Sequence, residues 1–280
     1  MGTFESLNME TPEGTRTITP EYLKGRVPEI KHKWVYLGIP IEAIAVAETM
    51  IYLGRELEAM EIHALILLGL SFSIIFIKNK EIQKTYQALI LLPILRLVDL
   101  SMPLFYEEKL YNLIFIYGLL AIPVSIAATN QGFTRTQLGI TFKNIGRYIP
   151  LSILLGLLLG VGEFFIVGKN PLINDLSIFN LLSLTIIMVF FVSPVEEIIF
   201  RSILQNRLET VLGGGEALII TSILFGLMHS GYGNIYEIFY ISSVGAFIGY
   251  LFYRTRSLPL VMLIHGFMNV FFFGIIPLLL

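Results

Sequence analysis

Residues 178–208 read IFNLLSLTIIMVFFVSPVEEIIFRSILQNRL, an apolar run that ends in charged residues. No charged residue occurs from 178 to 195, and the run is long enough for a helix that spans a bilayer. Glu196, Glu197 and Arg201 then lie within the same run. Because a charge at membrane depth is costly, an ionisable residue inside a span is a functional candidate by default.

The composition of the whole chain places this run in context. Of the 280 residues, 55% are hydrophobic and 14% are charged, and the mean hydropathy is +0.76. Soluble domains carry about 25% charged residues. These values exclude a disordered chain, a nucleic-acid-binding module and an ordinary soluble enzyme. They predict an all-α, polytopic integral membrane helix bundle whose surroundings are the lipid bilayer.

Apolar stretches recur along the chain and predict about eight or nine transmembrane helices. The second and seventh stretches are short. The stretches lie near 35–53, 62–77, 86–105, 111–128, 148–168, 178–208, 217–230, 235–253 and 258–280. Three parts follow: a polar N-terminal segment 1–34, N-terminal transmembrane helices in 35–177, and a C-terminal transmembrane core 178–280.

The distribution of Lys and Arg predicts the orientation of this multi-pass protein in the cell membrane. With the N-terminus inside, the inner segments hold fifteen of these residues and the outer segments hold three. The positive-inside rule therefore predicts a cytosolic N-terminus. Nine spans put the C-terminus outside, and eight spans would reverse one end.

The first polar motif is Ser193-Pro194-Val195-Glu196-Glu197, followed by Arg201. Glu197 and Arg201 are i,i+4, which favours an ion pair and leaves Glu196 about 100° away on the helix. A local alternative is a capping box, with Ser193 at the N-cap, Pro194 at N1 and Glu196 at N3. That alternative does not account for Arg201.

Two further motifs contain two of the four histidines of the chain. Phe225 and His229 are spaced i,i+4, and so are His265 and Asn269. A lone histidine on an apolar helix is more often a satisfied core residue than a functional one. Here both histidines follow the carboxylate pair within the C-terminal core.

Helix geometry predicts that these groups converge. Glu196 and His229 are equally far along the chain from a break just before Gly213-Gly214-Gly215, and an antiparallel hairpin would put both about 18 Å from one helix end. A last span that begins near 258 puts His265 and Asn269 about 10 and 17 Å in. The four polar groups are expected at one level, nearer the cytosolic side.

The remaining ionisable residues in the spans have structural interpretations. Arg96 and Asp99 are i,i+3 and are expected to neutralise each other. The others are isolated and are expected near the interface or bonded to neighbours: Glu42, Glu48, Glu163 and Glu237.

The chemistry of the converging set is that of amide hydrolysis. A carboxylate and an imidazole can hold and deprotonate a water, and a second imidazole and an amide can donate to an oxyanion. Alternatively, Glu196, His229 and His265 could hold a zinc ion with an open position. The chain has no cysteine and no H-E-x-x-H motif, which excludes Cys-ligated metal sites and an ordinary zincin.

At these motifs the sequence resembles the CPBP (CAAX protease and bacteriocin-processing, or Abi) intramembrane proteases, which include the Rce1 prenyl endopeptidases. The resemblance covers about residues 178–275 and makes this core the catalytic one. It implies a bundle of about eight helices with a conical cavity open to the cytosol. The motifs that carry it are Glu196-Glu197-x-x-x-Arg201, Phe225-x-x-x-His229 and His265-x-x-x-Asn269.

The resemblance also implies residue roles. Glu196 and His229 would activate the water, and His265 and Asn269 would form the oxyanion site. The supporting residues would be Glu197 and Arg201, with Phe225 shaping the cavity. The family is called a metalloprotease family, although its mechanism is also described as glutamate-dependent without a catalytic metal.

Three functions remain open on the sequence. The first is a membrane endopeptidase that cleaves a lipidated or membrane-bound peptide or protein: a prenylated CAAX C-terminus, a bacteriocin-like leader or a regulatory protein. The second is a transporter that uses Glu196, His229 and His265 as a proton or cation relay, although the paired halves common in transporters are not found. The third is a catalytically idle scaffold, which the intact Glu and His positions disfavour.

Overall fold

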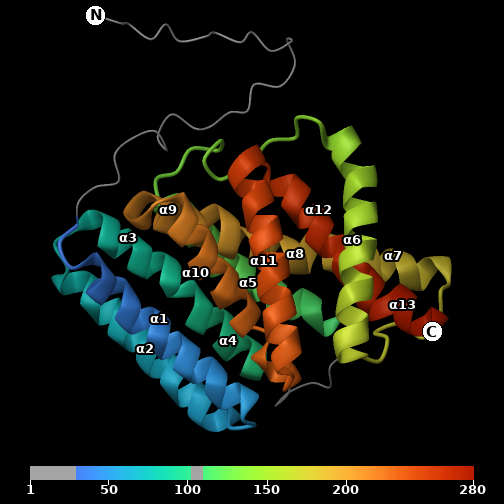
Figure 1. Cartoon of the computed structure of the whole chain (residues 1–280), viewed down its shortest axis with the longest axis horizontal. Coiled ribbons are helices and arrows are strands. Elements are labelled where there is room, and N and C mark those ends of the chain that lie inside the picture. The colour runs from blue at the N-terminus through green and yellow to red at the C-terminus, as the bar shows by residue number, and fades with distance from the viewer. Residues whose placement is uncertain (1–29, 102–109) are drawn as a thin grey trace, which may run out of the picture.

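The computed structural model describes residues 30–101 and 110–280, and these residues are helical with no strand (Figure 1). The N-terminal half contributes six helices: α1 (Lys33–Tyr52), α2 (Glu56–Phe76), α3 (Lys80–Leu89), α4 (Leu91–Ser101), α5 (Asn112–Asn130) and α6 (Ile145–Val167). An all-α membrane bundle is therefore confirmed. The predicted polar segment lies, up to residue 29, outside the described residues.

The C-terminal core begins with one continuous helical stretch. It comprises α7 (Ile178–Ile187), η3 (Met188–Val192), α8 (Ser193–Glu197), η4 (Ile198–Gln205) and α9 (Asn206–Leu212). After it come α10 (Gly214–Leu227), η5 (Ser230–Tyr232), α11 (Ile235–Thr255), α12 (Leu258–Val270), η6 (Phe271–Ile275) and α13 (Ile276–Leu279). The segments η3, η4 and η6 are π-helical. The π-helix is rare in proteins overall, and where it occurs it often lies at a functional site.

Seven helical stretches in the described residues are long and apolar enough to cross a membrane: 33–52, 56–76, 112–130, 145–167, 178–212, 235–255 and 258–279. The stretch expected near 62–77 is part of the full-length α2. The stretch expected near 86–105 is divided between α3 and α4 at Ile90, and the one near 217–230 forms the 14-residue α10. The last four residues of the stretch expected near 86–105 lie outside the described residues.

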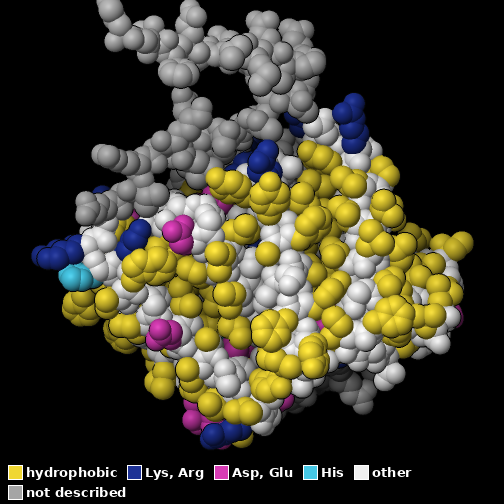
Figure 2. Space-filling model, viewed as in Figure 1, with side chains coloured by type: hydrophobic (Ala, Val, Ile, Leu, Met, Phe, Trp, Pro, Cys, Tyr) yellow, Lys and Arg dark blue, Asp and Glu magenta, His cyan; other side chains and the backbone are white. Residues whose placement is uncertain are grey.

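The outer surface of the bundle is apolar, as a lipid environment requires. Large side chains such as Leu65, Phe72 and Phe165 are more than half exposed. Figure 2 shows hydrophobic side chains spread over one face, with Lys and Arg side chains around its margin, mainly at the upper and left edges. In water such a surface would drive association, so the exposed apolar area supports a multi-pass membrane protein.

The capping-box interpretation of Ser193 is wrong. The backbone at Ser193 is already helical, because the chain enters α8 directly from η3. The Ser193 hydroxyl instead donates to the carbonyl of Met262 on α12 at 2.9 Å. Glu196 is therefore not engaged in capping, and its carboxylate is available to other groups.

The turn between α9 and α10 is tighter than the sequence indicates. The turn is made at Gly213 alone, with φ 105° and ψ 167°, and α10 starts at the next residue. Only glycine adopts this backbone conformation without strain. The two helices consequently extend to Leu212 and Gly214, closer to each other in sequence than expected.

Replacing Gly156 with alanine is expected to lower the free energy of unfolding by about 1–3 kcal/mol, the usual cost of overpacking. A Cβ at Gly156 on α6 would lie 2.8 Å from the backbone nitrogen of Met268 on α12. Gly146 on the same helix has nothing within 4 Å of its Cβ position and serves as the matched control. Denaturant titration of both variants in detergent checks this, and equal stability would contradict the close helix packing.

Candidate active site

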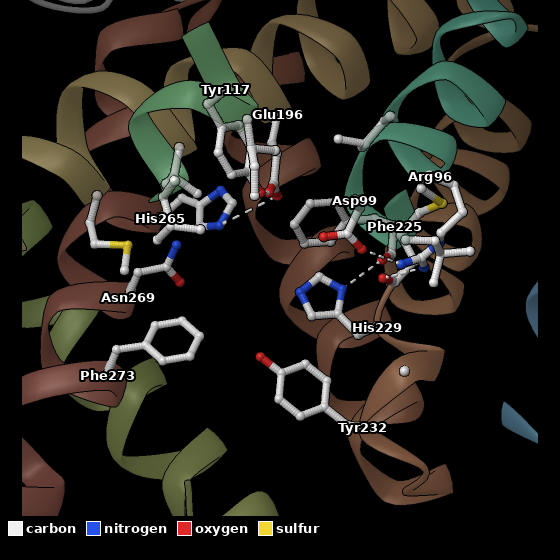
Figure 3. Close-up of a pocket in the computed structure, with 18 of the residues that line it drawn as sticks. Arg96, Asp99, Tyr117, Glu196, Phe225, His229, Tyr232, His265, Asn269 and Phe273 are labelled. Carbon is white, nitrogen blue, oxygen red and sulfur yellow. Dashed lines mark hydrogen bonds and ion pairs between the residues drawn. The ribbon is translucent and has the colours of Figure 1, made fainter. Parts of the chain in front are cut away.

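A cavity of about 330 Å³ lies inside the bundle, and the four residues of the predicted catalytic set all line it. Glu196 comes from α8, His229 from the turn after α10, and His265 and Asn269 from α12. Figure 3 shows their polar ends around one open space. The structure therefore brings together the side chains that the helix geometry predicts to converge.

Glu196 has one oxygen held and one oxygen facing the cavity. Its Oε1 accepts a hydrogen bond from the hydroxyl of Tyr117 on α5 at 2.5 Å. Its Oε2 lies 3.8 Å from Nε2 of His265, too far for a direct hydrogen bond. This second oxygen is the one placed to accept a proton from a molecule in the cavity.

His265 is oriented by the second carboxylate of the motif. Its Nδ1 lies 2.9 Å from Oε1 of Glu197, while Oε2 of Glu197 accepts from Nε of Arg201 at 3.0 Å. The side chains of Glu197 and Arg201 are completely buried, and the predicted i,i+4 ion pair is confirmed. With Nδ1 donating to Glu197, Nε2 of His265 is directed at the cavity (Figure 3).

His229 does not lie on the helix face that the spacing predicts. Helix α10 ends at Leu227, and His229 has φ −105° and ψ 13°, in the turn that leads to η5. Its Nδ1 lies 3.1 Å from the carbonyl oxygen of Phe225, so a proton on Nδ1 leaves Nε2 facing the cavity. The ring of Tyr232 stacks on it with centroids 6.1 Å apart.

Phe225 lies between the two histidines and forms the floor of the site. Its ring centroid is 5.4 Å from that of His229 and 5.7 Å from that of His265. The guanidinium of Arg201 lies 4.9 Å from the same ring. Asn269 is 8% exposed, and its amide has no hydrogen-bond partner within the described residues. Its donor is therefore free to bind a substrate oxygen.

Comparison with known families identifies this part of the chain. Residues 178–271 match the family model described as Type II CAAX prenyl endopeptidase Rce1-like. Over this matched stretch, the Rce1-like segment, the predicted resemblance is confirmed, and the segment contains all three motifs. Comparison with curated proteins and with solved structures gives no match.

The candidate active site lies further from the Gly213 turn than the sequence predicts. Glu196 lies 16 residues before the end of α9 and His229 lies 15 residues after the start of α10, because both helices extend further toward the turn than the sequence predicts. The cavity also reaches Asn112, at the start of α5, and Lys169, just after α6. It therefore extends toward the end of the bundle opposite the turn.

Two residues around the candidate active site carry no signal in the sequence. Tyr117 and Tyr232 belong to no motif, yet one bonds Glu196 and the other stacks on His229. Their partners could be found only from the tertiary structure. Asp99 also lines the cavity, beside Arg96.

The isolated carboxylates of the spans have three different environments. Glu42 is exposed near the middle of α1, and its position relative to the interface stays a prediction. Glu163, which also lines the cavity, and Glu237 are buried. Glu48 is not isolated, because it is completely buried and bonded to Arg96. The expected Arg96–Asp99 pair is confirmed at 2.9 Å.

The zinc alternative requires three ligands around one point. In the part of the chain that the structure describes, no three His, Asp or Glu side chains are placed to hold a metal ion. Nδ1 of His265 is engaged by Glu197 and Nδ1 of His229 faces a backbone carbonyl, which are the second contacts that metal-ligating imidazoles usually make, so both Nε2 atoms stay available. A zinc ion held by Glu196, His229 and His265 therefore stays a prediction.

Proposed function

We propose that the protein is an intramembrane endopeptidase that hydrolyses a peptide bond of a membrane-associated substrate, with a prenylated CAAX-type C-terminus as its substrate class. One observation carries the proposal. Inside the Rce1-like segment, a carboxylate from α8, an imidazole from the turn after α10, and an imidazole and a carboxamide from α12 line one cavity. These are the groups that water-mediated amide hydrolysis needs.

In this proposal, Glu196 and His229 activate the attacking water. Oε2 of Glu196 accepts a proton from the attacking water, and Nε2 of His229 holds that water by a hydrogen bond. Tyr117 keeps the carboxylate in place through Oε1. The proton on Glu196 then passes to the leaving amine, which restores the carboxylate.

His265 and Asn269 stabilise the developing oxyanion by donating hydrogen bonds to it. Both side chains line the cavity from α12. Donors fixed before the reaction stabilise charge without reorganisation, which is the basis of an oxyanion site. Glu197 accepts from Nδ1 of His265, so a proton on Nε2 makes this ring a cationic donor. The buried Glu197–Arg201 pair thus supports the oxyanion side of the site.

A cleavage assay in detergent tests the proposal. Wild-type protein is offered a quenched fluorescent farnesylated CAAX peptide and its non-farnesylated twin, beside the variants Glu196→Ala and His229→Ala. We expect cleavage by the wild type alone, and faster cleavage of the farnesylated peptide. Cleavage that survives either substitution would defeat the residue assignment, and absent cleavage with proton-coupled flux in liposomes would favour the transporter. Metal analysis and chelation of the same sample check a zinc requirement.

Replacing Tyr117 with phenylalanine is expected to lower kcat by about 10- to 100-fold with little change in KM. The substitution removes a hydrogen bond to a charged group, worth about 1.5–3 kcal/mol, and leaves the ring in place. Steady-state kinetics on the same peptide checks this. An unchanged kcat would mean that the Tyr117–Glu196 contact does not act in the reaction.

Single-cysteine labelling is expected to put Lys143 inside and Asn174 outside, as the distribution of Lys and Arg predicts. The chain has no native cysteine, so Lys143→Cys and Asn174→Cys each give one exposed target. A membrane-impermeant maleimide on intact cells should label only Asn174→Cys. Asn174 lies at the end of the bundle opposite the Gly213 turn, toward which the cavity extends. The reverse pattern would contradict the orientation and put that end of the cavity on the cytosolic side.

A further inference from the structure

The turn that contains His229 is held from both sides by residues outside the Rce1-like segment. The preceding residue, Met228, accepts a hydrogen bond on its carbonyl from Nη2 of Arg96 at 2.6 Å. The following residue, Ser230, donates its hydroxyl to Oε2 of Glu48 at 2.7 Å. The two contacts span 132 and 182 positions of sequence, so they tie α4 and α1 to the site.

Glu48 and Arg96 form one buried unit. Arg96 donates to both oxygens of Glu48, from Nε at 2.9 Å and from Nη2 at 2.6 Å. Nε2 of His63 on α2 lies 3.1 Å from Oε1 of Glu48. Oδ2 of Asp99 accepts a hydrogen bond from Nη1 of Arg96 at 2.9 Å. Bidentate pairing fixes the guanidinium plane, which a lysine in its place could not reproduce.

The backbone at His229 lies in a turn, where its N–H donates to the carbonyl of Gly226 at 2.9 Å and its carbonyl accepts from the N–H of Tyr232 at 3.2 Å. It follows the end of α10 and precedes the short η5, so no helix continues through it. The ring contacts of His229 are with Phe225 and Tyr232, which orient the ring and do not fix its backbone. A displacement of about 1 Å in a catalytic group can cost on the order of 100-fold in rate.

We propose that Glu48 and Arg96 are positioning residues that hold His229 in the cavity through Ser230 and Met228. This inference rests on the proposed function. It assigns a role in the reaction to the N-terminal half of the chain, which the family match does not cover. Arg96 also lines the cavity, whereas Glu48 is not among its lining residues, and the role proposed for the pair is exerted through the turn.

Kinetics of matched variants tests the proposal. We expect Arg96→Lys to lower kcat by about 10- to 100-fold with KM unchanged, and Ser230→Ala, a milder change that keeps the ion pair, to lower it by about 3- to 10-fold. Arg256→Lys is the control, because Arg256 is equally buried and bonded to Glu209 away from the cavity. Equal loss of kcat in Arg96→Lys and Arg256→Lys would overturn the proposal as a general stability effect.

Nitrogen NMR of the histidine rings separates this inference from the proposed function. The chain has four histidines, and a His229→Gln sample assigns the His229 signals. We expect Arg96→Lys and Ser230→Ala to shift or broaden the His229 ring signals and to leave those of His265 unchanged. Unchanged His229 signals would overturn the positioning role, whether or not the wild type cleaves peptide. Absent wild-type cleavage with shifted His229 signals would overturn the proposed function alone.

Discussion

Replacing Glu196 with glutamine is expected to lower the rate of peptide cleavage by about 10²- to 10⁴-fold, the usual contribution of a general base. Glutamine matches the size of glutamate and can still accept the hydrogen bond that Tyr117 donates to Oε1. Its amide nitrogen, which takes the place of Oε2, cannot accept a proton from water. Initial rates on the quenched farnesylated peptide, at equal amounts of folded protein, check this expectation.

Two controls make this result specific to the site. Glu216→Gln changes an exposed glutamate in the first turn of α10 and should leave the rate unchanged. The thermal unfolding temperature of Glu196→Gln should stay close to that of the wild type, because within the described residues the carboxylate makes no ion pair closer than its 3.8 Å contact with His265. A rate within threefold of the wild type would remove Glu196 from the mechanism.

Sequence spacing predicted the parts of the site that lie within single helices. The i,i+4 rule predicted the Glu197–Arg201 pair, and the i,i+3 rule predicted the Arg96–Asp99 pair, because helix geometry fixes these distances locally. The glycine run also located the hairpin that brings Glu196 and His229 to one cavity. Such inferences need only the rise and rotation of a regular helix.

The contacts between distant segments could not be predicted in the same way. Tyr117 reaches Glu196 across 79 positions, and Arg96 reaches Glu48 across 48. Neither spacing has a periodic meaning, since the pairing depends on how α1, α4 and α5 pack against the core. From sequence, Glu48 and Arg96 are separate ionisable residues, and their shared role emerges only when the bundle is assembled.

Irregular backbone accounts for the wrong local interpretations. A capping box at Ser193 assumes that a helix begins there, but π-helical η3 carries the chain through without a break. Helical spacing of Phe225 and His229 assumes that α10 continues, but α10 ends at Leu227. π-helical segments and short turns have no strong sequence signature, and both occur close to the candidate site.

Replacing Glu197 with alanine is expected to lower the free energy of unfolding by about 3–5 kcal/mol, the cost of removing one partner of a buried ion pair. Arg201 is completely buried, and Glu197 is its salt-bridge partner within the described residues. Within the described residues, Nη1 and Nη2 of Arg201 have no hydrogen-bond partner. Denaturant titration in detergent measures the loss, and on the folded fraction cleavage should fall less than in Glu196→Ala.

The double variant Glu197→Leu, Arg201→Met separates the uncompensated charge from other effects. Replacing both ions by apolar groups of similar size is often neutral, so most of the lost stability should return. A deficit of about 1–3 kcal/mol should remain, because Nδ1 of His265 loses its acceptor in either variant. If the double variant were as unstable as Glu197→Ala, the buried Arg201 charge would not be the cause. If instead cleavage fell equally in Glu196→Ala and Glu197→Ala, the division of the two carboxylates into a base and a supporting residue would be wrong.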